Sequence, residues 1–124
     1  MFPLIWLPLL IKLVGCEEDL VVQPLVAPSQ LTEGRRVFLT CQVLKGEKPF
    51  NYVWRFNGNN LQFDDNVHVH SPYEDLSILT INHLKYKNIG LYTCHVSNKF
   101  KNDSSSVQIE FKGNIAGFVY RVDD

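Results

Sequence analysis

Apolar and polar residues alternate with a period of two along most of the chain after residue 20, and turn residues interrupt this alternation at short intervals. The pattern is typical of a sandwich of short strands and predicts an all-β fold. Pro24 and Pro28 indicate an edge strand, and Asn57-Gly58 predicts a tight turn. We expect strands at residues 20–26, 35–42, 50–56, 60–62, 66–70, 76–81, 90–97 and 105–112.

Two cysteines, a tryptophan and a tyrosine form the most informative group in the sequence. Trp54 follows Cys41 by 13 residues and precedes Cys94 by 40, and Tyr92 stands two residues before the second cysteine. This arrangement resembles that of immunoglobulin-superfamily domains, in which one disulfide joins two small sheets. The resemblance implies a Cys41–Cys94 bridge with the indole packed against it. It also implies a hydrogen bond from the tyrosine hydroxyl to the backbone near residues 83–87.

An apolar leader, MFPLIWLPLLIKLVG, opens the chain and gives way at once to the acidic run EED. The leader is shorter than the ~20 residues that span a bilayer, and its two prolines disfavour a buried helix. We expect residues 1–16 to be a secretory signal peptide, cleaved after Gly15 or Cys16. Only the second site leaves an even pair of cysteines. The sequence LVGC also resembles a bacterial lipidation box that would retain Cys16, but the immunoglobulin-type core favours a secreted animal protein.

The resemblance covers about residues 20–112, and we assign residues 17–112 to one immunoglobulin-like domain. We interpret residues 113–124 as a C-terminal tail or truncated linker that folding does not need; an extra strand is the alternative. The given chain has no second apolar stretch of membrane-spanning length, so we expect a secreted, extracellular protein. A truncated or alternatively spliced product of a longer membrane receptor is the preferred explanation of the tail.

The segments VLKGEKPFNYVWRFNG, SILTINHL and YTCHVSN resemble domains of the Down syndrome cell adhesion molecule. Such domains are of the intermediate set, and the short stretch between residues 56 and 66 leaves no room for the extra strand of a variable-type domain. The resemblance implies homophilic cell adhesion and recognition in axon guidance or immunity. Family members usually carry Asp where Asn88 stands, paired with an Arg, so we expect that ion pair to be absent here.

Charge and composition exclude several functions. The chain has 12 Lys and Arg residues and 13 Asp and Glu residues, for a net charge of −1. Loss of Lys12 with the leader makes the mature charge about −2. No block of basic residues appears, so nucleic acid is not an expected partner. The sequence shows no nucleophile motif and no phosphate-binding glycine loop, so we expect neither an enzyme nor a cofactor. Asp64-Asp65 is interpreted as a solvated loop.

Two short motifs carry possible chemistry. His68-Val69-His70 would place two imidazoles on the same side of a strand. A zinc site needs more ligands, and none can be identified, so we interpret the pair as exposed histidines and expect no metal. Asn102-Asp103-Ser104 is the only N-glycosylation sequon. We expect it in the loop before the last strand, where a glycan would make the protein a glycoprotein.

Counting alternate positions from the inward-facing residues predicts a partner-binding face on one sheet. That face has an apolar centre and a rim of histidines, because its outward residues are Phe38, His68, His70, Leu76, Ile78 and Thr80. The outward positions of the other sheet are mostly polar, namely Arg55, Thr93, His95 and Glu110. Apolar surface gathered on one face favours a protein partner.

The sequence therefore predicts an extracellular protein-recognition module, with a second copy of the chain as the homophilic candidate partner. Around a two-fold axis like residues approach one another, so protonation of His68 and His70 below pH ~6 would weaken association. The competing hypothesis is a secreted decoy or effector that binds a membrane receptor heterophilically. Further modules and a membrane helix encoded downstream would favour an adhesion receptor over a decoy.

Overall fold

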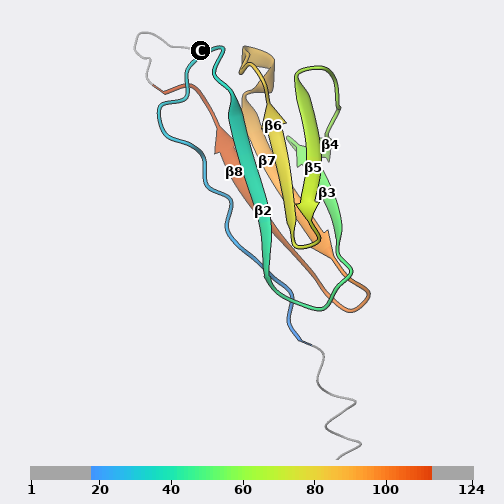
Figure 1. Ribbon diagram of the computed structural model, residues 1–124. Coiled ribbons are helices and arrows are strands. Elements are labelled where there is room, and N and C mark those ends of the chain that lie inside the picture. Colours follow the sequence, from blue (N-terminus) through green and yellow to red (C-terminus); the bar gives the residue numbers. More distant parts are fainter. Residues whose placement is uncertain (1–17, 113–124) are drawn as a thin grey trace, which may run out of the picture.

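Two four-stranded antiparallel sheets pack face to face in the computed structural model of the chain, which describes residues 18–112 (Figure 1). One sheet has the order β1-β2-β6-β5 and the other the order β4-β3-β7-β8. This arrangement confirms the predicted all-β sandwich. The strands are β1 (Val21–Val22), β2 (Val37–Lys45), β3 (Asn51–Phe56), β4 (Asn59–Asn60), β5 (Val67–Tyr73), β6 (Leu76–Ile81), β7 (Gly90–Ser97) and β8 (Asn102–Ile109).

The predicted signal peptide (1–16) and C-terminal tail (113–124) lie outside the described residues. Within residues 18–112, no helix is long and apolar enough to cross a membrane. A short 3-10 helix, Tyr86–Asn88, lies between β6 and β7.

The core follows from the period-two alternation of the strands. On β2 every second residue from Val37 to Val43 is buried, and the residues between them are exposed. β7 repeats the pattern, with buried positions at Gly90, Tyr92, Cys94 and Val96. The inward residues of the two sheets thus meet in one apolar layer, which is the usual core of a sandwich.

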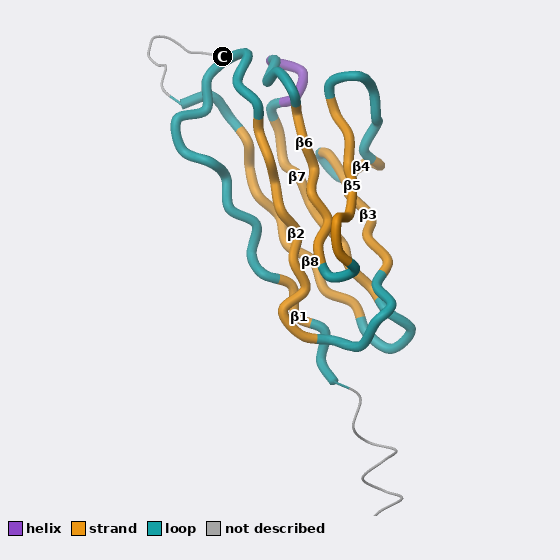
Figure 2. The backbone as a smooth tube through the Cα atoms, in the orientation of Figure 1, coloured by secondary structure: helices purple, strands orange, loops and turns teal. Residues whose placement is uncertain are grey.

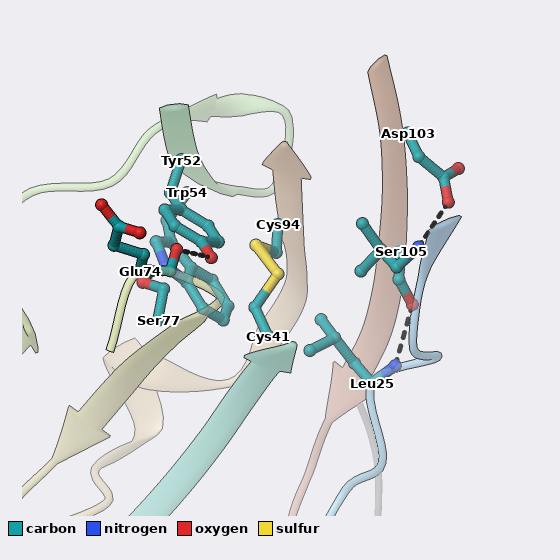
Figure 3. Close-up of a disulfide and its surroundings, with 10 residues drawn as sticks. Leu25, Cys41, Tyr52, Trp54, Glu74, Ser77, Cys94, Asp103 and Ser105 are labelled. Carbon is teal, nitrogen blue, oxygen red and sulfur yellow. Dashed lines mark hydrogen bonds between the residues drawn. A yellow bond between two sulfur atoms is a disulfide. The ribbon is translucent and has the colours of Figure 1, made fainter. Parts of the chain in front are cut away.

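The Cys41–Cys94 disulfide joins β2 to β7 and thereby links the two sheets. Cys41 pairs with Ser77 on β6, and Cys94 pairs with Trp54 on β3. Trp54 Nε1 donates a hydrogen bond to Ser77 Oγ at 3.0 Å, and both side chains are buried. Figure 3 shows the indole beside the disulfide, so a covalent bond and a buried hydrogen bond cross the core at the same level. A disulfide that joins residues as far apart in the sequence as Cys41 and Cys94 stabilises a small domain by ~2–5 kcal/mol.

Residues 20–31 are here called the N-terminal strap. They begin with β1, which pairs with the end of β2, and then run along the side of the sandwich (Figure 2). The prediction of a full strand at 20–26 is wrong, because only Val21–Val22 pairs with β2. Beyond that point Pro24 has no N–H to donate. The strap instead contacts both sheets through three hydrogen bonds: Gln23 N to Gln42 O (2.9 Å), Val22 N to Asp103 Oδ2 (2.9 Å) and Leu25 N to Ser105 Oγ (2.8 Å).

The bounds of other strands also differ from the predicted ones. β8 begins at Asn102 and ends at Ile109, three residues earlier at each end than expected, because it pairs residue for residue with β7. The sequon at Asn102 therefore opens a strand and does not lie in the preceding loop. β2 and β5 extend three residues further than predicted, to Lys45 and Tyr73, and β4 is limited to Asn59–Asn60.

The turn before β7 is fixed by a tyrosine and an asparagine. Tyr92 donates its hydroxyl proton to Asn88 O at 2.6 Å, one residue beyond the predicted range of 83–87. Burial raises the pKa of this phenol, so it remains a donor. Asn88 is itself buried, and its Oδ1 accepts from Lys85 N at 3.0 Å and from Asn66 Nδ2 at 3.3 Å. A hydrogen bond between the side-chain amides of Asn66 and Asn88 thus connects the start of β5 to the turn.

We predict that Ser77→Ala destabilises the domain by about 1–3 kcal/mol, because it leaves the buried indole N–H of Trp54 without an acceptor. Urea unfolding followed by fluorescence measures the change. Ser71→Ala on the exposed part of β5 is the matched control and should shift the free energy of unfolding by less than ~0.5 kcal/mol. Equal stabilities for the two variants would contradict the role assigned to Ser77.

We also predict that Asp103→Ala loosens the N-terminal strap, because Val22 N then loses its acceptor on β8. Amide hydrogen exchange at Val22 and its neighbours should accelerate, while exchange in β7 stays unchanged. Asp103→Asn retains an acceptor oxygen and the sequon, so its exchange rates should remain closer to those of the original chain. Unchanged exchange at Val22 in Asp103→Ala would show that strand pairing alone holds the strap.

Candidate protein-binding face

The outward residues of β2, β6 and β5 form rows across the sheet, because these strands pair in antiparallel register, which one bulge in β5 shifts between His70 and Tyr73. We call this surface the β2-β6-β5 face. Its three central rows are Phe38–Thr80–His68, Thr40–Ile78–His70 and Gln42–Leu76–Tyr73.

The exposure of these side chains varies along the rows. Phe38 on β2 is 52% exposed, and His68 and His70 are exposed on the edge strand β5. Leu76 and Ile78 on the central strand are partly buried. Thr80 was expected as an outward surface residue, but it is only 4% exposed. It lies on the outward side between Phe38 and His68, whose larger side chains flank it.

Sequence reasoning missed apolar residues at the end of the face where β1 meets β2. Leu44 is 56% exposed, and it follows Phe38 by six positions on the same side of β2. Leu44 was missed because the predicted strand ended at residue 42. Tyr73 is 68% exposed and pairs with Leu76 across a bulge in β5. Extending β2 by the same alternation would have identified Leu44, whereas in β5 the alternation leads to Pro72 and only the bulge brings Tyr73 into the row.

The outward surface of the other sheet is more polar. Thr93 Oγ1 and Ser106 Oγ lie 2.7 Å apart in a hydrogen bond between β7 and β8. Leu91 is an exposed apolar residue of this surface, and Asn102 is exposed at the start of β8. The sequon therefore lies on the sheet opposite the β2-β6-β5 face.

The loop between β4 and β5 contains the paired carboxylates Asp64 and Asp65. Asp64 Oδ1 accepts hydrogen bonds from Asn66 N and Val67 N, both at 2.8 Å. These backbone donors hold the pKa of the Asp64 carboxyl below its usual value, with a smaller contribution from Lys87. The carboxylate thus caps the turn into β5, which is a structural role for this group.

The described residues contain no group of three or more His, Cys, Asp or Glu side chains arranged to hold a metal ion. His68 and His70 lie on the same edge of the sheet, at the end of the Phe38 and Ile78 rows. Their row neighbours are Thr80 and Ile78, neither of which supplies a typical zinc ligand.

A groove of ≈ 410 Å³ lies between β4, which ends early, and the start of β5, and Val67 of β5 is among the residues that line it. Phe56 and Tyr92 line it, and their rings pack 4.8 Å apart. Lys87 and Asp64 also line the groove, and they form an ion pair at 3.8 Å. Both side chains are about half exposed or more, so this pair adds little stability.

Known proteins share this fold and part of this sequence. A family model described as "Immunoglobulin domain" matches residues 21–98. Mouse palladin is 30% identical over 84 residues, which are 68% of this chain and 6% of that protein. A chicken MAM domain-containing glycosylphosphatidylinositol anchor protein 1 is 30% identical over 102 residues, covering 81% of this chain and 10% of the relative. The chain thus spans a tenth or less of the length of these relatives.

Solved structures match the whole sandwich. The Dscam1 Ig7 domain, isoform 5, superposes with a TM-score of 0.72 at 16% identity, covering 78% of this chain and all of that one. Titin domain M4 gives a TM-score of 0.68 at 14% identity, with 79% of this chain and all of that one covered. These likenesses support the intermediate-set architecture predicted from the sequence. With the Cys41–Cys94 bridge and the match over residues 21–98, they show that the chain belongs to the immunoglobulin domain family.

Proposed function

We propose that the chain is an extracellular protein-recognition module of the adhesion type, which binds through the β2-β6-β5 face and pairs with a second copy of itself. Immunoglobulin domains typically bind proteins, and a disulfide-bonded domain is consistent with an oxidising, extracellular location. The observation that carries the proposal is the distribution of apolar side chains. Phe38, Ile78 and Leu44 gather on one sheet, whereas the outward rows of the other sheet are rich in hydroxyl groups.

Two features make this face suitable for pairing with its own copy. Regular strands give it a rigid floor, so few side chains must be ordered when two copies meet. Around a two-fold axis its central row, Thr40–Ile78–His70, would approach the same row of the partner. A glycan on Asn102, proposed here as a modification, would leave the face open because that residue lies on the other sheet.

The resemblance to Down syndrome cell adhesion molecule domains and the match to a glycosylphosphatidylinositol anchor protein support a role at cell surfaces. A role in axon guidance or immune recognition is part of this proposal. The main alternative is a soluble decoy that uses the same face to bind a membrane receptor.

We predict that Phe38→Asp and Ile78→Asp abolish self-association, because each places a charge in the apolar centre of the face. Truncation of a central contact typically costs at least ~2 kcal/mol, or about thirty-fold in the dimer constant. Sedimentation of the purified chain over a range of concentrations measures the effect. Leu91→Asp, an exposed leucine on the other sheet, is the matched control and should still associate. A chain that is monomeric throughout would exclude homophilic pairing and leave a receptor as the partner.

We further predict that self-association weakens as the pH falls from about 7.5 to about 5.5, the range in which exposed imidazoles gain a proton. Protonation of His68 and His70 would then place positive charges opposite each other across the two-fold axis. The double variant His68→Gln/His70→Gln should lose this pH dependence, whereas His95→Gln on β7 should keep it. Equal pH dependence in all three proteins would contradict the proposed place of the histidines in the interface.

A further inference from the structure

A shallow dish of ≈ 410 Å³ continues the β2-β6-β5 face beyond the Phe38 row. Arg36 lies two positions before Phe38, just ahead of β2, and Asn82 lies two positions after Thr80, just beyond β6. Asn82 N donates to Asn66 O at 2.8 Å, so Asn66 and Asn82 lie side by side as the next row. The residues that line the dish are Arg36, Asp65, Asn66, Asn82, His83 and Lys85.

Side-chain amides hold the floor of the dish in one geometry. Asn66 Oδ1 accepts from His83 N at 2.8 Å, and Asn66 Nδ2 donates to His83 O at 2.9 Å. Asn82 Nδ2 donates to Asp65 O at 3.0 Å. Two asparagine side chains therefore fix three backbone groups, namely the N–H and C=O of His83 and the C=O of Asp65. A rigid floor of this kind lowers the cost of ordering the site when a ligand binds.

The dish and the face below it carry an excess of positive charge. Arg36, Lys85 and His83 are exposed, and Asp65 is the one carboxylate among the residues that line the dish. The outward positions of β2, β6 and β5 in the four rows contain no carboxylate. His68 and His70 occupy the ends of the next two rows, so cationic and titratable groups follow one another along the strands.

The spacing of these groups matches a polymer better than a single anion. Same-side residues of a strand are about 6.8 Å apart, so the rows of Arg36 and His70 are separated by about 13–14 Å. A free sulfate or phosphate ion could contact one row, whereas a linear polyanion lying along the strands contacts several. The exposed ring of Phe38 lies between these rows and offers an apolar surface to a sugar ring.

We propose that this part of the β2-β6-β5 face binds a linear sulfated polysaccharide of the glycosaminoglycan class, with Arg36 and Lys85 as the principal contacts for its sulfate groups. His83, His68 and His70 add contacts when they are protonated. Polysaccharide binding is a function additional to the proposed protein recognition. It does not depend on protein recognition, because the polysaccharide site is centred on the dish and not on Ile78.

Binding is expected to strengthen in mildly acidic solution, because protonated imidazoles add positive charge to the site. Arg36, Lys85 and Asp65 line the dish with His83, and the Lys87–Asp64 pair lies on the same loops. The row neighbours of His68 and His70 carry no charge. Hydrogen bonds from backbone N–H groups lower the pKa of Asp64, so this carboxylate stays ionised in mildly acidic solution. The expected pH dependence is thus opposite to that of self-association.

The test is a fluorescence anisotropy titration of a labelled heparin oligosaccharide with the full-length chain, at concentrations below self-association. Arg36→Ala/Lys85→Ala should raise the Kd about twenty-five-fold, since each cation near an anionic surface contributes roughly a factor of five. The control Lys45→Ala/Lys99→Ala removes the same charge from other exposed positions and should change the Kd less than about two-fold. Thermal melting of both double variants verifies that they fold.

Three further measurements test whether the ligand is a sulfated polysaccharide. The same oligosaccharide after desulfation should bind at least about ten-fold more weakly, as expected for contacts with sulfate charges. At pH ~5.5 the original chain should bind several-fold more tightly, and His68→Gln/His70→Gln/His83→Gln should lose this gain. An equal rise in the Kd for Arg36→Ala/Lys85→Ala and for the control Lys45→Ala/Lys99→Ala would overturn the proposal. Binding to phosphatidylserine vesicles through Arg36 and Lys85, without binding to heparin, would also overturn it and indicate an anionic membrane.

A negative result with heparin would not bear on self-association. The self-association of Phe38→Asp and Ile78→Asp is measured separately, by sedimentation without polysaccharide. A chain that binds heparin but stays monomeric would retain the polysaccharide site and exclude homophilic pairing.

Discussion

The disulfide between Cys41 and Cys94 sets the orientation of every strand on which the proposed surface depends. Because both sulfur atoms lie between the sheets, β2 and β7 have a fixed inward side. Ser77 and Trp54 point inward as well, because they are the cross-strand partners of the two cysteines. Phe38 must then point outward, three positions from Cys41 on the opposite side of the strand. A one-residue slip of β2 would bury Phe38 and expose Leu39, so the bridge protects the face as well as the core.

The N-terminal strap shows a different way of closing a sandwich. A sheet edge can be covered by backbone pairing, but here Asp103 and Ser105 on β8 use their side chains to accept N–H groups from the strap. These two residues point inward on a strand whose outward neighbours are polar, so they fill the gap between the sheets where the core ends. Figure 3 shows both contacts on the opposite side of the disulfide from Trp54. The edge is thereby shielded without a long first strand.

Alternation predicted the strands and the outward direction of Phe38, and the resemblance to immunoglobulin domains predicted the two sheets and the bridge. They did not predict the bounds of β8, because Asn102–Ser106 is a polar run that looks like a loop and becomes a strand only through its pairing with β7. The cationic dish was also invisible in the sequence. Arg36, Asn66 and Lys85 come from three separate segments, and no basic block marks them. Only the fold brings these residues together.

The central claim is that recognition takes place on the β2-β6-β5 face. The most direct measurement is an NMR titration in which amide chemical shifts of the ¹⁵N-labelled chain are followed as its own concentration is raised. The account predicts concentration-dependent shifts at Phe38, Ile78 and His70, with the amides of Thr93 and Ser106 on the other sheet unchanged. Shifts confined to β7 and β8 would contradict it and place the contact surface on the opposite sheet.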